Sequence, residues 1–272
     1  MALDTSRAQI VLQSWLDANA KQLNNFILGI YGVGDDSRPT HLGTCFLVNG
    51  ISDRYLITAG HVLNNKSEMS LKLLTPTGFC DLDEPFFRSV VRNGNPSTDI
   101  IDIAFLPLSN NLLHKLKNLE GLALDCLNSV PDTNSGHILA AAGLPSTKNE
   151  PDHRLRHIQV QPYLISGAAK LCPNALKDFG FSDSTHLFIH HSKRHGFFSD
   201  GTRTNSPKLI GMSGGPVLYL GSDAQLSAPK IEYGKIRVVG VLIEQHKNYS
   251  VLIGSKVGDL PNVFLRLETP KV

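Results

Sequence analysis

The sequence predicts an all-β protein, a sandwich or a barrel, that carries one helix at its N-terminus. Three observations predict this. Short β-rich segments such as RYLITAGHV and KIRVVGVLI recur along the chain. Clusters of Gly, Pro, Asn and Asp, such as NGNPSTD and PDTNSG, separate them. Apolar residues follow a helical face only between residues 6 and 23, where the simplest expectation is a helix docked on the body.

Composition and charge limit the kind of protein. The 272 residues are 41% hydrophobic and 18% charged, as in a globular chain with one large core or two packed half-domains. The formal net charge is +2 and the basic residues are scattered, so neither nucleic acid nor a membrane is an expected partner. No stretch reaches the roughly 18–20 apolar residues of a membrane span, and the polar N-terminus does not fit a signal peptide.

The four cysteines, Cys45, Cys80, Cys126 and Cys172, form no CxxC pair, and their spacing selects no disulfide pairing. Without a secretion signal, free thiols in a reducing compartment are the expectation. The sequence therefore predicts a soluble, cytoplasmic protein.

One stretch, LIGMSGGPVLYL at residues 209–220, places Ser213 among glycines between two strand-like runs. Such glycines suit a backbone with positive φ or a close approach of another group. The stretch alone fits a structural turn and a loop that presents the serine to a ligand equally well. His61 follows the apolar run RYLITAG, where a structural histidine is the simpler interpretation. Asp102 opens the strand DIAFLPL, where an aspartate usually turns or caps the chain.

These three residues occur in the chain order His, Asp, Ser, each at the end of a β segment. Their local words are TAGHV, DIAFLPL and GMSGGPV. Together the words resemble those of the chymotrypsin/trypsin-like serine peptidases, the compact bacterial members more closely than the digestive ones. The resemblance spans residues 26 to about 260, and GxSGGP is its most specific part. It implies two six-stranded antiparallel Greek-key barrels with an added N-terminal helix, no cofactor, and a protein or peptide substrate.

The resemblance also assigns catalytic roles. His61 is the general base that activates Ser213, and Asp102 orients His61. The backbone N–H groups of Gly211 and Ser213 form the oxyanion hole. Asp99, three residues before Asp102, is the rival for the third role; Asp102 is preferred because it directly opens the apolar strand.

The chain departs from the digestive members in two places. Val62 stands where their catalytic-histidine disulfide has its second cysteine, so Cys45 has no partner there. Met212 stands where they carry the aspartate that receives a newly freed N-terminus, so activation by that route is not expected.

Substrate preference is not predicted. Pro207 and Lys208 stand near the position that carries aspartate in trypsin-like members. The segment of the later strand VVGVLIEQHKN that aligns with their pocket wall consists of Ile243, Glu244 and Gln245, the expected substrate-binding residues.

Four histidines of HLFIHHSKRH also suggest a metal site: His186, His190, His191 and His195. Their spacing fits no zinc pattern, and alternate strand residues point to opposite faces. A polar edge strand followed by a basic loop is the expectation, with no metal.

The expected domains are a helical extension over residues 1–25, a first barrel with the histidine and aspartate over 26–122, and a second barrel with the serine over 123–272. The leading hypothesis is a serine endopeptidase that works through an acyl-enzyme, with narrow specificity or a regulatory partner. The alternatives are a latent or inactive peptide-binding scaffold and an esterase on the same fold.

Overall fold

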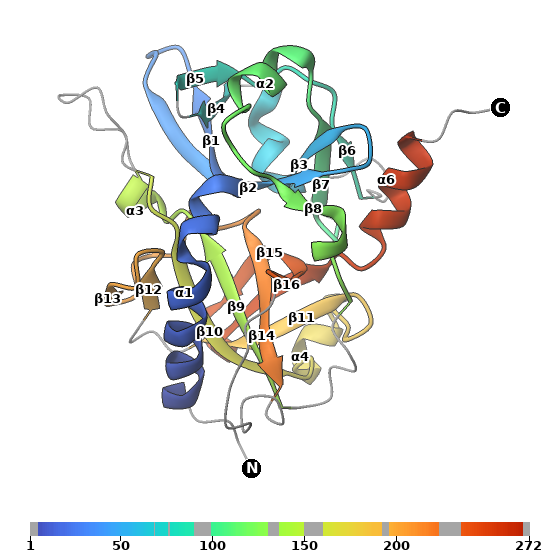
Figure 1. Ribbon diagram of the computed structural model, residues 1–272. Helices are drawn as coiled ribbons and strands as arrows, with labels where there is room; N and C mark the ends of the chain where they lie inside the picture. The colour runs from blue at the N-terminus through green and yellow to red at the C-terminus, as the bar shows by residue number, and fades with distance from the viewer. Residues whose placement is uncertain are drawn as a thin grey trace.

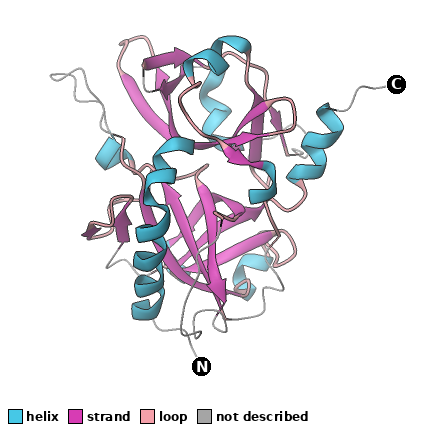
Figure 2. Ribbon diagram, in the orientation of Figure 1, coloured by secondary structure: helices cyan, strands magenta, loops and turns pink. Residues whose placement is uncertain are grey.

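The computed structural model describes residues 5–67, 69–75, 77–89, 99–129, 136–149, 160–191, 196–222 and 235–268. Two β-sheets lie one above the other in Figure 1, with α1 (Thr5–Phe26) along one side. The remaining helical segments are shorter and lie around the sheets, as Figure 2 shows. They are α2 (Asn110–Lys115), α3 (Ser146–Asn149), α4 (Asn174–Lys177), α6 (Leu260–Glu268) and the 3-10 segments Gly60–Ser67, Leu124–Cys126 and Lys247–Tyr249.

The second sheet closes into a six-stranded antiparallel barrel. Its strands run in the order β11-β16-β15-β14-β9-β10, and β10 pairs back to β11. A hairpin of β12 and β13 extends the sheet from β10. The strands are β9 (His137–Gly143), β10 (Tyr163–Lys170), β11 (His186–His190), β12 (Gly196–Phe198), β13 (Arg203–Thr204), β14 (Pro216–Ser222), β15 (Val238–His246) and β16 (Val251–Lys256).

The first sheet has the order β5-β4-β1-β2-β3-β7-β6, with β8 parallel beside β2. Its strands are β1 (Ile27–Val33), β2 (Pro39–Asn49), β3 (Arg54–Ala59), β4 (Ser70–Thr75), β5 (Gly78–Asp81), β6 (Phe87–Arg88), β7 (Ile103–Pro107) and β8 (Leu122–Ala123). The all-β class with an added helix is confirmed. Within the described part of the chain no pairing joins β5 to β6, so hydrogen bonds close only the second barrel. The expected domain boundary between residues 122 and 123 falls inside β8.

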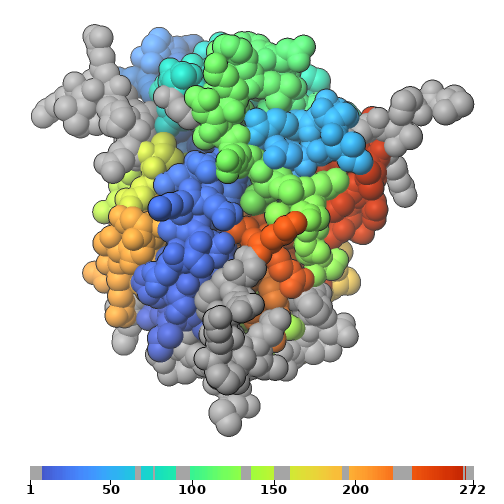
Figure 3. All heavy atoms as spheres, viewed as in Figure 1, coloured from blue at the N-terminus to red at the C-terminus, as the bar shows by residue number. Residues whose placement is uncertain are grey.

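Helix α1 docks on the outside of the second barrel and runs without a linker into β1. Its buried face includes Leu12, Trp15, Leu16 and Leu23. The Ser166 hydroxyl of β10 donates to the Ala8 carbonyl at 2.9 Å. The helix also lies beside the β12–β13 hairpin in Figure 3, where Ser199 donates to the Asn24 side chain at 3.3 Å. The helix therefore connects both halves of the protein.

Docking of α1 accounts for the burial of β9 at every position. Ala140 and Ala142 belong to the large core that includes the buried face of α1, whereas Ala141 belongs to the interior of the second barrel. A strand covered on both faces loses the alternation of apolar and polar residues that a half-exposed strand shows.

Strand β11 corrects one sequence prediction. It pairs with β16 on one side and with β10 on the other, so it is not an edge strand. His186 and His191 are buried, while the loop from 192 to 195 lies outside the described residues. The polar sequence was misleading because imidazole rings can be buried when their nitrogens find hydrogen-bond partners.

The last helix, α6, was not expected from the sequence. It returns the chain to the first sheet, where Phe264 stacks on Tyr55 at 4.2 Å between ring centroids and meets Phe105 at 5.0 Å. No helix among the described residues is long and apolar enough to cross a membrane. The four cysteines are buried and free.

Candidate active site

His61 lies directly after β3, in the first turn of a 3-10 segment, and faces Asp102 at the start of β7. The His61 Nδ1 to Asp102 Oδ2 distance is 2.5 Å. The backbone N–H of His61 donates to the other carboxylate oxygen at 2.8 Å. The N–H of Gly60 donates to the Asp102 carbonyl at 2.8 Å. The carboxylate side chain is 14% exposed and the imidazole 44%, so the ring has one orienting partner and one side open to the cleft.

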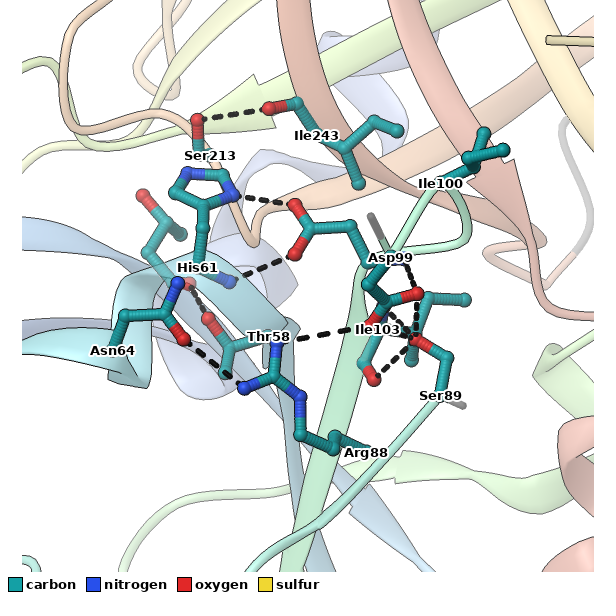
Figure 4. A network of polar contacts seen from close by, with 12 residues as sticks. Thr58, His61, Asn64, Arg88, Ser89, Asp99, Ile100, Ile103, Ser213 and Ile243 are labelled. Atoms are coloured by element: carbon teal, nitrogen blue, oxygen red, sulfur yellow. Dashed lines mark hydrogen bonds and ion pairs between the residues drawn. The ribbon is translucent and has the colours of Figure 1, made fainter. Parts of the chain in front are cut away.

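Asp99, the rival aspartate, contacts Asp102 rather than His61. Its buried carboxylate accepts the Asp102 N–H at 3.0 Å and the Ser89 hydroxyl at 2.7 and 2.9 Å. Asp102 has φ = +49°, a conformation that costs a non-glycine residue roughly 1–3 kcal/mol and persists only when its surroundings enforce it. Asp99 therefore helps to hold the backbone from which Asp102 reaches His61. Figure 4 shows Asp99 beside Ser89.

Ser213 lies in the turn between Leu209 and β14, next to the His61 ring in Figure 4. Its hydroxyl donates to the Ile243 carbonyl of β15 at 3.4 Å. Among the described residues no hydrogen bond joins it to His61. A catalytic hydrogen bond is often absent or long until substrate binds. His61 thus contacts Asp102, Figure 4 draws Ser213 beside the His61 ring, and the serine hydroxyl is held by the Ile243 carbonyl.

The peptide groups around Ser213 have a fixed orientation. The Ile210 carbonyl accepts an N–H from α3 at 2.8 Å, and the Met212 carbonyl accepts the Gly215 N–H at 3.0 Å. Because trans peptides hold C=O and N–H on opposite sides, the N–H groups of Gly211 and Ser213 point away from these bonds. Gly211 adopts φ = +89°, which glycine reaches without strain. Within the described part of the chain neither of these two N–H groups has a hydrogen-bond acceptor.

Thr44 of β2 holds this loop from the first sheet. Its side chain is fully buried, and its hydroxyl donates to the Gly211 carbonyl at 2.7 Å. Its N–H donates to the Ser213 carbonyl at 2.8 Å. The loop that carries the serine in one half of the protein is thus fixed by a strand of the other half.

His41 and Ser146 pack behind Gly211. The His41 Nδ1 lies 3.1 Å from the Ser146 hydroxyl, and a Cβ on Gly211 would lie 2.4 Å from that hydroxyl. Burial lowers the pKa of His41 to about 4. The ring is therefore neutral near neutral pH, and it contributes no charge beside the donors of the loop.

The lowered pKa of His41 predicts a pH dependence of stability. In the unfolded chain the imidazole titrates near pH 6.5, so between about pH 6.5 and 4 only the unfolded state binds this proton. The free energy of unfolding is therefore complete above pH 6.5 and falls as the pH drops, by about 2 kcal/mol at pH 5 from this group alone. In urea unfolding at pH 7.5 and pH 5, His41→Gln should reduce the difference between the two values by that amount. An unchanged difference would contradict the prediction.

A cavity of about 460 Å³ lies beside the His61–Asp102 pair. Two of the expected substrate-binding residues, Ile243 and Glu244, line it. Gln245 follows them on β15 but does not line it. The apolar wall comes from Ile100, Phe179 and Phe181, which sequence analysis missed. Phe179 is 68% exposed, so most of its side chain is open to solvent at the edge of this cavity.

Three other residues singled out in the sequence have structural contacts. Met212 is fully buried in the interior of the second barrel, and Val62 packs against Gly43, where a Cβ would lie 2.6 Å away. His186, the first of the four histidines considered for a metal, hydrogen-bonds to the carbonyl of Ile100 instead. Among the described residues no group of three or more His, Cys, Asp or Glu side chains is placed to hold a metal ion.

Comparison with known proteins gives a likeness in structure only. No protein-family model and no curated protein sequence matches the chain. The Vibrio cholerae VesB protease superposes with a TM-score of 0.50 at 12% identity, over 89% of this chain and 64% of that one. The serine protease domain of the Sesbania mosaic virus polyprotein gives 0.43 at 17% identity, over 86% and 90% of the two chains. At such identities the comparison speaks for the fold alone, and this chain has the two-barrel, chymotrypsin-like fold.

Proposed function

We propose that the protein is a serine endopeptidase with Ser213 as nucleophile, His61 as general base and Asp102 as the residue that orients the imidazole. The observation that carries the proposal is the His61 Nδ1 contact of 2.5 Å with Asp102, placed beside a serine whose loop leaves two N–H donors free. A lone structural histidine needs neither the neighbouring serine nor the oriented peptides.

The chemistry follows from these positions. Ser213 Oγ attacks the carbonyl carbon of the scissile peptide while His61 Nε2 takes the hydroxyl proton. The carbonyl oxygen becomes an oxyanion and accepts bonds from the N–H groups of Gly211 and Ser213, each worth about 2.7–4 kcal/mol in such sites. His61 then gives its proton to the leaving amine, and the peptide C–N bond breaks. Water, activated by His61, hydrolyses the resulting ester and restores the serine.

Active-site labelling tests the proposal. A fluorophosphonate probe should phosphonylate Ser213, and peptide mass spectrometry should locate the adduct. Ser213→Ala should abolish the label, and His61→Ala should slow it strongly, with circular dichroism showing that both variants are folded. A folded wild type that takes no label would favour the latent scaffold. The hydrogen bond from Ser213 to the Ile243 carbonyl would then hold the serine in an inactive position. Cleavage of simple esters but of no peptide would favour an esterase.

The cavity beside His61 indicates how a peptide would be held. We infer that the exposed ring of Phe179, together with Ile100 and Phe181, takes an apolar side chain on the acyl side of the scissile bond. Narrow specificity and a regulatory partner, both expected from the sequence, are compatible with this pocket. The cytoplasmic location expected from the sequence stays a prediction.

Phe179→Ala should lower kcat/KM about 10- to 100-fold for peptides with an apolar residue at that position, since burying such a side chain is worth roughly 1.5–3 kcal/mol. The rate of phosphonylation by a small probe should not change. Peptide-library profiling of both proteins measures the effect. Ile51→Ala, at a residue that is 75% exposed, is the matched control and should leave the profile unchanged. A profile that Phe179→Ala also leaves unchanged would remove the pocket from substrate binding.

A further inference from the structure

His186 of β11 makes a contact that the proposed catalytic chemistry does not use. Its ring is 1% exposed, and its Nε2 lies 2.9 Å from the Ile100 carbonyl. Ile100 belongs to the loop of the first sheet between Asp99 and Asp102. The contact therefore crosses from the second barrel to the loop that carries the proposed triad aspartate.

The hydrogen bonds fix which nitrogen carries the proton. The Ser182 N–H donates to His186 Nδ1 at 3.4 Å, and the Thr185 hydroxyl lies 2.8 Å from the same nitrogen. Nδ1 is thus an acceptor, and the proton of the neutral ring is on Nε2, where it is donated to Ile100. Burial lowers the pKa of His186, which keeps the ring in this neutral form. Phe181 packs against the ring in an edge-to-face arrangement, at 5.0 Å between centroids.

The side chain of Ile100 is held from the same barrel. A Cβ on Gly180 would lie 2.4 Å from Ile100 Cδ1, so the isoleucine occupies the space that a glycine leaves open. The second barrel therefore contacts Ile100 at two places. His186 hydrogen-bonds to its carbonyl, and the segment after α4 packs against its side chain.

Asp102 needs such support because its φ of +49° is strained. Asp99 and Ser89 supply part of it from within the first sheet. We propose that His186 is a positioning residue: through its bond to Ile100 it lets the second barrel set the orientation of Asp102 against His61. The inference rests on the proposed function for its catalytic consequence. It also mirrors Thr44, through which the first sheet holds the serine loop.

Three substitutions separate a positioning role from simple packing. His186→Gln keeps an N–H donor at the place of Nε2, whereas His186→Asn is one methylene too short to reach Ile100. His186→Phe keeps the ring and removes the donor. His190→Phe and His190→Gln, at the other end of β11, serve as matched controls. Circular dichroism and thermal unfolding establish that each variant is folded.

Two measurements follow. The first is the proton NMR signal of His61 Nδ1–H, which reports the hydrogen bond to Asp102 directly and needs no activity. We expect His186→Asn and His186→Phe to shift or broaden it, and His186→Gln and both His190 variants to preserve it. The second is the rate of phosphonylation of Ser213, which we expect to fall about 100-fold in the Asn and Phe variants, the usual effect of a misplacement near 1 Å, with partial rescue by Gln.

The outcomes are distinguishable from those of the proposed function. A wild type that takes no label would contradict the peptidase assignment. The His61 Nδ1–H signal would still test whether His186 affects the hydrogen bond between Asp102 and His61. A folded His186→Asn with the wild-type signal and labelling rate would overturn the positioning role, and so would a Gln variant that behaves like Asn. If His186→Phe does not fold, the Asn and Gln pair decides alone, because both side chains are polar and smaller than the ring.

Discussion

Asp102→Asn should lower kcat by about 10⁴-fold while the protein stays folded, the loss known for this change in a Ser-His-Asp triad. The carboxylate accepts from His61 Nδ1 at 2.5 Å, and this bond keeps the ring proton on Nδ1 so that Nε2 is free to act as base. An asparagine amide that turns its NH₂ group to the ring selects the other tautomer. Steady-state hydrolysis of a peptide found by library profiling measures the effect.

Asp99→Asn is the matched control for this prediction. It retains one carbonyl oxygen to accept the Asp102 N–H, so we expect a loss of about 10-fold or less, through a less rigid support of Asp102. If Asp99→Asn caused the larger loss, the third role in the triad would pass to Asp99, against the contacts described above.

Gly214→Ala should both destabilise the protein and abolish labelling of Ser213. Gly214 has φ = +89°, and an added Cβ would lie 2.0 Å from the Thr44 carbonyl oxygen and 2.2 Å from Thr58 Oγ1. The positive φ costs an alanine roughly 1–2 kcal/mol, and overpacking adds about 1–3 kcal/mol. We expect a loss of about 3 kcal/mol or more in urea unfolding, with the displaced loop no longer reaching His61.

Gly34→Ala provides the control. Nothing lies within 4 Å of a Cβ at Gly34, in the turn between β1 and β2. That variant should unfold within about 0.5 kcal/mol of the wild type and take the label at the same rate. Equal stability of the Gly214 and Gly34 variants would mean that the serine loop is less tightly fixed than the contacts with β2 indicate.

The fold class and the three residues proposed as a triad could be identified from the sequence because the evidence for each lies in short, contiguous stretches. The words around His61, Asp102 and Ser213 are contiguous, and each follows or opens a strand whose apolar run is visible in the sequence. The pocket could not be predicted in the same way. Phe179 and Ile100 are far apart in the chain and meet only because the two barrels face each other, so no local pattern connects them.

Strand β11 and helix α6 show a second limit. The histidines of β11 are polar by composition, and only the partners of their rings make burial possible. Helix α6 has only nine residues, and its place is set by the stacking of Phe264 on Tyr55, more than 200 residues earlier in the chain. In both cases contacts with residues distant in sequence decide where the element lies in the fold.

The docking of α1 has a consequence for the time course of folding. The bond from Ser166 to Ala8 joins residues that are 158 positions apart, and the strands that cover the helix follow it in the chain. At a synthesis rate of roughly 5–20 residues per second, the apolar face that carries Trp15 waits about 8–30 s for its binding surface to emerge. During synthesis the apolar face of α1 therefore stays uncovered until the second barrel has emerged, and it offers a point of attachment for a chaperone on the nascent chain.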